Sequence, residues 1–308
     1  MNRSPPRVPA ACQAILIAGT TASGKSGLAN CYAHATDGLI VNADALQVYS
    51  CWRILTARPT AEDEKRHDHA LYGHVDYAEP YSVGSWLHEV DALRKQNPGR
   101  LLIIVGGTGL YLTSLLSGLA PIPAIDDTTR RKANAIVAAS GLAALRDELI
   151  AVDPDTAAII DMNNPARLQR AWSVWHSTGK GMAAWHSETA PPLFARESVL
   201  SVVIECERTR LADRIAARLD SMITQGLLDE CRNIRPRWDP DLPASRALGA
   251  AEIMAHLGGR MTLEAALSAA GQATRRYAKR QRTWLRNRMT GWLRIEADMT
   301  EHIHGRRP

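Results

Sequence analysis

The chain has 308 residues, a hydrophobic content of 45% and a formal net charge of +5 at pH 7. It has no apolar run of the roughly eighteen residues that a membrane-spanning helix needs, so we expect no membrane contact. The five cysteines are scattered and form no C-x-x-C pair, which favours reduced thiols in the cytoplasm over disulfides or zinc. Residues 1–12 lack the apolar centre of a secretory signal, so we expect a loose tail.

A glycine-rich segment follows a short apolar run at 14–18 and precedes an amphipathic stretch that ends near Ala35. It matches the pattern G-x-x-x-x-G-K-[ST], which cradles phosphate when it joins a strand to a helix. The backbone N–H groups and the helix start favour an anion, Lys25 adds a full charge, and the Ser26 hydroxyl is suited to Mg²⁺. We predict a phosphate or pyrophosphate site, and a purely structural turn is the alternative. We call this predicted site the cradle. It consists of Gly19, Thr20, Thr21, Ala22, Ser23, Gly24, Lys25 and Ser26.

An acidic residue, Asp44, follows a second short strand predicted at 38–41. Ligands of open parallel sheets bind at the carboxyl ends of the strands, so we expect Asp44 close to the cradle. Its carboxylate is suited to a metal or water ligand or to a general base, and a turn cap is the alternative. The loop-rich stretch that follows, residues 53–82, contains His67 and His69, which we interpret as surface histidines rather than a metal pair.

A third strand is predicted at 100–105, after a helix at 82–96, and it is apolar on both faces, as in a buried parallel sheet. It ends in Gly106, Gly107 and Thr108, where ATPases of the P-loop type usually carry an aspartate that holds Mg²⁺. The glycines allow close approach to the backbone, and the threonine hydroxyl offers a neutral hydrogen bond. The sequence therefore predicts an anion cradle without the usual apparatus of ATP hydrolysis.

An uninterrupted series of helical patterns predicts an all-helical insertion domain at 123–191. A strand pattern at 198–204 then returns the chain to the sheet, so the predicted core comprises 13–122 and 192–308. The predicted fold class is α/β, with a parallel sheet flanked by helices as in P-loop NTPases. A polar, basic group at 167–170 begins one helix of the insertion.

Two helices of the predicted core carry basic faces. The first, at 208–225, places Arg210, Arg214 and Arg218 on one side, where they are either solvated or in contact with an anion. The second lies within 272–286.

The stretch 275–288 contains seven Lys and Arg residues and no Asp or Glu. A local field of that sign indicates nucleic acid or another polyanion. We expect Tyr277 and Trp284 to pack inward and most of the basic side chains to contact phosphates.

In chain order, these motifs resemble those of the bacterial tRNA isopentenyltransferase family, the tRNA dimethylallyltransferases. The matching segments are residues 21–26, 42–49, 56–59, 106–111, 167–170, 178–180, 214–228 and 277–284. The sequence departs from the family pattern at Thr20, Ala45 and Ala250, where the family usually has Pro, Ser and Tyr.

The resemblance implies transfer of a dimethylallyl group from dimethylallyl diphosphate to N6 of adenosine 37 in the anticodon stem-loop of tRNA. It implies Mg²⁺ as cofactor and a cytoplasmic monomer. Asp44 would be the general base, Thr108 would hydrogen-bond at the reacting centre, and Arg218 would help to neutralise the diphosphate. The implied tRNA contacts are Asp44, Ala45, Leu46, Gln47, Thr108, Arg130, Ala166, Arg167, Leu168, Gln169, Arg170, Arg246, Lys279, Arg280, Gln281, Arg282 and Arg286.

Three other functions remain open at this point. A small-molecule kinase of the P-loop type would place ATP in the cradle, but it has no need of the basic C-terminal helix. A prenyltransferase acting on free adenylate would keep the cradle without that basic surface. A non-catalytic RNA-binding protein with a relic cradle is disfavoured, because Lys25, Asp44 and Thr108 are all intact.

Overall fold

The computed structural model describes residues 5–297, so the predicted tail and the end of the predicted core lie partly outside it. The chain divides into two compact units, residues 1–116 with 193–308, and residues 117–192. The first unit contains β1 (Ala14–Gly19), α1 (Lys25–Thr36), β2 (Leu39–Asn42), α2 (Ala61–Arg66), β3 (His69–Ala70), α3 (Val83–Gln96), β4 (Leu102–Gly106), α4 (Gly109–Ser117), β5 (Val199–Glu205), α9 (Arg208–Thr224), α10 (Leu227–Ile234), α11 (Ala250–Leu257), α12 (Leu263–Arg288) and β6 (Leu293–Glu296).

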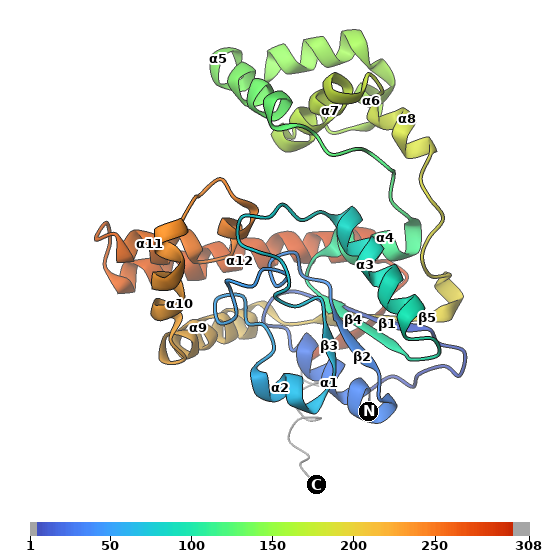
Figure 1. Cartoon of the computed structure of the whole chain (residues 1–308), viewed down its shortest axis with the longest axis vertical. Coiled ribbons are helices and arrows are strands. Elements are labelled where there is room, and N and C mark those ends of the chain that lie inside the picture. The colour runs from blue at the N-terminus through green and yellow to red at the C-terminus, as the bar shows by residue number, and fades with distance from the viewer. Residues whose placement is uncertain (1–4, 298–308) are drawn as a thin grey trace. The chain divides into compact units, whose positions relative to one another are not determined.

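The six strands form one sheet in the order β3-β2-β4-β1-β5-β6, and every strand pairing in the described residues is parallel (Figure 1). The central strands β1 and β4 are buried along their whole length. This burial matches their continuous apolar sequences, because a parallel sheet is covered on both faces. The predicted α/β class with a parallel sheet is confirmed.

Alternate residues of β1 enter two different cores. Leu16 packs in a cluster with residues of α3, α4 and α12, such as Trp86 and Leu285. Ile15 and Ile17 pack on the other face with residues of α1. The side-chain period of two along a strand thus assigns one helical layer to each face of the sheet.

A separate hydrophobic cluster joins α9, α10 and α11 to the loops that follow β2. It buries large side chains from both parts, including Trp52 and Tyr77 from the loops and Met254 from α11. The indole N–H of Trp52 donates to the Ala244 carbonyl, 2.9 Å away, so the polar edge of this buried ring is satisfied. This cluster fixes the loops that border the functional site.

The second unit, residues 117–192, contains only helices in the described structure: α5 (Asp127–Val152), α6 (Pro154–Ile159), α7 (Pro165–Thr178) and α8 (Met182–Ser187). Gly141 interrupts α5 with a φ of 72°, which lies outside the helical range. The hydrophobic core of this unit includes Leu149 and Trp172, and the Trp172 indole N–H donates to Glu148. Residues 117–192 thus form one compact unit whose described secondary structure is helical.

The stretch predicted as loop-rich also contains regular structure. A single-turn helix, α2, begins after Thr60, whose side chain and backbone form a capping box with Asp63. It is too short for a periodic signal, as is the edge strand β3. The sequence patterns also did not predict α4, α10 or β6. No helix among residues 5–297 combines the length and apolar character needed to cross a membrane.

Candidate active site

The glycine-rich segment forms a tight loop between the carboxyl end of β1 and the start of α1. Gly24 has a φ of 92°, and Ala22 adopts a φ of 59°, an unusual backbone state for a residue with a side chain. A Cβ at Gly19 would lie 2.6 Å from Ser23 Oγ, so any larger residue would displace the Ser23 side chain. Ser23 is fully buried, and its hydroxyl has no hydrogen-bond partner among residues 5–297. The loop therefore has a curled backbone suited to an anion.

Lys25 is the cation of the loop. Its ammonium group donates to the Thr20 carbonyl over 2.6 Å. The pKa of Lys25 is lowered to about 8, mainly because the side chain is buried; the carboxylate of Asp44 opposes this shift and the nearby Arg218 adds a smaller lowering. At neutral pH the ammonium form still predominates, so the loop keeps its positive charge.

Asp44 is oriented by its neighbour Asn42. The Asp44 backbone N–H donates to Asn42 Oδ1 (2.8 Å), and the Asn42 amide donates to the carbonyls of Asp44 (3.0 Å) and Leu71 (2.9 Å). Asp44 Oδ1 accepts from the Leu46 N–H at 3.0 Å, and Oδ2 faces Gly107, where a Cβ would lie 3.5 Å away. One carboxylate oxygen thus fixes the side chain while the other faces the end of β4.

The ends of β2 and β4 are joined directly. The Thr108 hydroxyl accepts from the Ala45 N–H (3.0 Å), and the Thr108 N–H donates to the Ala43 carbonyl (3.2 Å). A Cβ at Gly106 would lie only 2.0 Å from that carbonyl oxygen. The structure therefore brings the segments that carry Asp44 and Thr108 together, and glycine at 106 makes their approach possible.

Gln281 of α12 joins the cradle to the end of β4. It is 6% exposed, accepts from the Thr21 N–H (2.9 Å) and donates to the Gly107 carbonyl (2.9 Å). Both ends of its amide are therefore engaged within the protein, which differs from the expected contact with tRNA. Trp284 packs inward against Gly109, as predicted.

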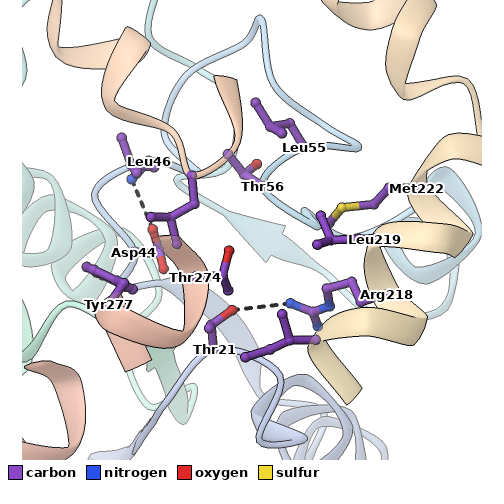
Figure 2. Close-up of a pocket in the computed structure, with 12 residues that line it drawn as sticks. Thr21, Asp44, Leu46, Leu55, Thr56, Arg218, Leu219, Met222, Thr274 and Tyr277 are labelled. Atoms are coloured by element: carbon purple, nitrogen blue, oxygen red, sulfur yellow. Dashed lines mark hydrogen bonds between the residues drawn. The ribbon is translucent and has the colours of Figure 1, made fainter. Parts of the chain in front are cut away.

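The basic face predicted on α9 borders the cradle. Arg218 donates to the Thr21 hydroxyl at 3.4 Å (Figure 2). Arg214 donates to the Ala22 carbonyl, also at 3.4 Å. These long hydrogen bonds bring two guanidinium groups beside the loop that holds Lys25. Their placement adds positive charge around the anion site.

A second, mostly apolar pocket adjoins the cradle, and we call this pocket the hollow. A polar pocket lined by the loop, Asp44 and Tyr72 shares Thr21, Asp44, Thr56 and Arg218 with this neighbouring hollow. The remaining lining of the hollow is mostly apolar: Leu46, Leu55, Ile215, Leu219, Met222, Leu248, Thr274 and Tyr277 (Figure 2). The sequence did not single out most of these residues.

The other residues predicted to contact tRNA on the sheet-containing unit differ in how exposed their side chains are. Gln47 is not free, because its amide donates to the carbonyls of Thr56 (2.8 Å) and Ala57 (3.2 Å). Arg282 is half-buried. The exposed basic residues are Arg246, Lys279, Arg280 and Arg286.

The predicted group on the helical unit begins α7. Leu168 is fully buried in the core of that unit, so its side chain cannot reach a partner. Gln169 is half-buried and donates to Asn134 at 3.1 Å. The exposed members of the group are Ala166, Arg167 and Arg170, together with Arg130, which pairs with Asp127.

No cluster of three or more His, Cys, Asp or Glu side chains suited to a metal occurs among residues 5–297. His67 and His69 are both half-buried. Mg²⁺ in phosphate sites usually keeps several waters and takes one or two protein oxygens with the substrate phosphates. Ser26 and Asp44 both line the polar pocket, so the residues fit a magnesium ion carried with a diphosphate.

A curled loop between a buried parallel strand and a helix, with a lysine at the helix start, defines a phosphate-binding protein of the P-loop type. The chain belongs to the IPP transferase family, whose model matches residues 47–288.

Curated relatives agree with this membership. The chain is 51% identical over 281 residues to the tRNA dimethylallyltransferase of Cereibacter sphaeroides, covering 91% of this chain and 88% of the relative. It is 52% identical over 282 residues to the tRNA dimethylallyltransferase of Paracoccus denitrificans, covering 90% and 92%.

Solved structures agree as well. The full-length tRNA isopentenylpyrophosphate transferase from Bacillus halodurans matches with a TM-score of 0.65 and 31% identity, covering 95% of this chain and 94% of that one. A eukaryotic dimethylallyltransferase acting on tRNA matches with a TM-score of 0.77 at 24% identity, covering 92% and 74%, and shows the shared fold.

Proposed function

We propose that this protein transfers a dimethylallyl group from dimethylallyl diphosphate to N6 of adenosine 37 of tRNA, next to the anticodon. The observation that carries the proposal is the continuity of the polar cradle with the apolar hollow through Thr21, Asp44, Thr56 and Arg218. An allylic diphosphate has the same two parts, an anionic head and a short apolar chain. The tRNA-modifying activity named for the relatives supports this choice of donor and acceptor.

The cradle would stabilise the leaving group. As the bond between the allylic carbon and oxygen breaks, its electron pair leaves with the diphosphate, and the charge develops beside Lys25, Arg218 and the loop N–H groups. Fixed donors at that position lower the barrier because they need no reorganisation during the reaction. A magnesium ion, held through Ser26 and the phosphates, would supply further neutralisation.

Asp44 would act on the nucleophile. The adenine N6 forms the new bond to the allylic carbon and loses a proton, which Asp44 would accept. Its Oδ1 is already held by the Leu46 N–H, and Oδ2, which faces Gly107, would take the proton. The Thr108 hydroxyl, fixed against Ala45, would hydrogen-bond beside the reacting amine.

The exposed basic residues of α12, Lys279, Arg280 and Arg286, would contact the RNA backbone. The base itself must leave its stack to reach Asp44, as enzymes that act on a base require. We extend the proposed RNA contacts to Arg246 and to the exposed start of α7 in the helical unit. Gln281 and Leu168 are omitted from the proposed contacts because their side chains are buried.

A kinase is a weaker explanation of the same site. The end of β4 carries Gly106 and Gly107 instead of a carboxylate, and the apolar hollow has no role in binding a phosphate acceptor. A free-adenylate prenyltransferase would use the hollow but leave the basic face of α12 unexplained.

The test uses purified protein with Mg²⁺, dimethylallyl diphosphate and unmodified tRNA. We expect a prenylated adenosine, detected by mass spectrometry of the digested RNA. Parallel reactions replace tRNA with AMP or the allylic donor with ATP. Transfer to AMP at an equal rate would support the adenylate enzyme, ATP consumption without transfer would support the kinase, and RNA binding without product would support a relic.

A further inference from the structure

One wall of the apolar hollow is a single tight turn, residues 53–58. Two internal hydrogen bonds close it, from the Ala57 N–H to the Ile54 carbonyl and from the Arg58 N–H to the Arg53 carbonyl, both at 2.9 Å. Leu55 and Thr56 of this turn line the hollow, and Thr56 also lines the cradle pocket. The position of the turn therefore sets the shape of both parts of the site.

The first end of the turn binds a carboxylate from a distant element. Glu230 of α10 accepts from three consecutive backbone N–H groups: Oε1 from Arg53 (2.7 Å) and Ile54 (2.8 Å), and Oε2 from Leu55 (2.8 Å). Consecutive N–H groups that point the same way form an anion-binding concavity. Without the carboxylate, these donors would need other partners, because an unpaired buried N–H is costly.

The other end of the turn binds a donor. The Gln47 amide donates to the carbonyls of Thr56 and Ala57, and the Thr56 hydroxyl donates to the Trp52 carbonyl at 2.8 Å. An anion at the N–H end and a donor at the carbonyl end match the polarity of a helical turn. The turn is thus held at both ends by side chains outside it.

Glu230 also connects two walls of the hollow. It lies on α10, directly after α9, which contributes Arg218, Leu219 and Met222 to the lining. Figure 2 shows Leu55 and Thr56 on a loop beside the helix that carries Leu219 and Met222. A carboxylate that joins this loop to α10 therefore fixes the spacing between the two walls.

We propose that Glu230 is a positioning residue for the allylic diphosphate: its clamp on residues 53–55 holds Leu55 and Thr56 against the donor. The proposal rests on the proposed function. Glu230 does not contact the reacting atoms, so its loss acts on donor binding through the turn. A displacement of about 1 Å in such a wall is enough to change rates by large factors.

The test compares Glu230→Ala and Glu230→Gln with Asp229→Ala, which changes the adjacent acidic residue of α10. Asp229 is exposed and pairs with Arg232 on the same helix, so it is a matched control. Glutamine keeps the shape but replaces one acceptor with an NH₂ group that faces N–H donors. We measure kcat, the KM for dimethylallyl diphosphate and the KM for tRNA, and hydrogen exchange of the peptide covering 50–60.

We expect Glu230→Ala to raise the KM for the donor about tenfold and Glu230→Gln about threefold, with the KM for tRNA unchanged. The amides of 53–55 should exchange faster in both variants and at the wild-type rate in Asp229→Ala. If Glu230→Ala does not fold, the KM values and the hydrogen exchange of Glu230→Gln still test the proposal.

Equal rises in both KM values, or wild-type exchange in both Glu230 variants, would overturn the clamp. A wild-type enzyme without prenyl transfer would instead overturn the proposed function, and the exchange measurement would still report on the clamp.

Discussion

The polar pocket that contains the cradle shares four residues with the hollow, yet the cradle and the hollow are built in opposite ways. The cradle is one continuous run, residues 19–26, and the anion site proposed there depends on backbone geometry and one lysine. The hollow gathers side chains from loops after β2, from α9, from α12 and from the segment before α11. The difference teaches that an anion site can be local in sequence, whereas an apolar shape requires the whole tertiary structure.

The two regions should therefore respond to different changes. The cradle depends on charge, so substitutions and pH changes that remove charge should act on it. The hollow depends on volume, so substitutions that keep polarity but change size should act there.

Substitution of Asp44, which belongs to both regions, should have the largest effect. Asp44→Asn keeps an acceptor for the Leu46 N–H but removes the base, so we expect kcat to fall about 10³-fold with tRNA affinity unchanged. Single-turnover prenyl transfer and filter binding of tRNA measure the two quantities. Equal losses in both would mean that Asp44 is structural.

The charge of Lys25 should appear in the pH profile. Because burial lowers the pKa of Lys25 to about 8, the ammonium form is lost as the pH rises through that value. We expect kcat/KM for the donor to fall above about pH 8 in the wild type and to stay level there in Lys25→Arg, whose guanidinium remains charged. Lys25→Ala should lower kcat/KM about 10²-fold at pH 7. A high-pH fall retained in the arginine variant would assign that titration to another group.

The hollow should respond to size alone. Met222→Ala removes apolar volume from its lining, so we expect kcat/KM for dimethylallyl diphosphate to fall about tenfold and that for geranyl diphosphate to rise. Met254→Ala is the control, since Met254 is equally buried but does not line the hollow. Identical donor preferences in the two variants would remove the hollow from the donor site.

The exposed basic face should give the smallest effect, outside both regions. Lys279→Ala should weaken tRNA binding a few-fold and reduce the slope of log K against log[salt] by about one. Lys65→Ala, an equally exposed lysine on α2, should leave that slope unchanged. Binding titrations between low and moderate salt measure both, and an unchanged slope in Lys279→Ala would exclude a phosphate contact.

The features that could be predicted from the sequence are those set by residues close together along the chain. The cradle, the central strands and the position of Asp44 follow from glycine spacing, apolar runs and the geometry of parallel sheets. The internal role of Gln281 could not be read in this way, because it depends on Thr21 and Gly107, which are distant along the chain. The pattern on α12 identified a basic helix but could not show which of its polar side chains points inward.

The residues that line the hollow could be predicted from the sequence only in part. Ile215, Leu219 and Met222 recur at helical spacing on α9, which marks an inward stripe without saying whether it faces a core or a cavity. The role of Glu230 could not be predicted from any sequence pattern, because its hydrogen-bond partners are backbone groups of a turn far away along the chain. Short elements such as α2 and β3 were missed because periodicity needs several turns or residues to appear.

Gly106 has a consequence for the fate of the donor. Any side chain there would collide with the Ala43 carbonyl, and moving that carbonyl would displace the neighbouring Asp44. A carboxylate at position 106, of the kind that ATPases of the P-loop type use to hold Mg²⁺, would therefore displace Asp44, the proposed base. Under the proposed function, Gly106 would therefore keep Asp44 and Thr108 in contact and leave the donor diphosphate without the carboxylate that ATPases use at this strand end.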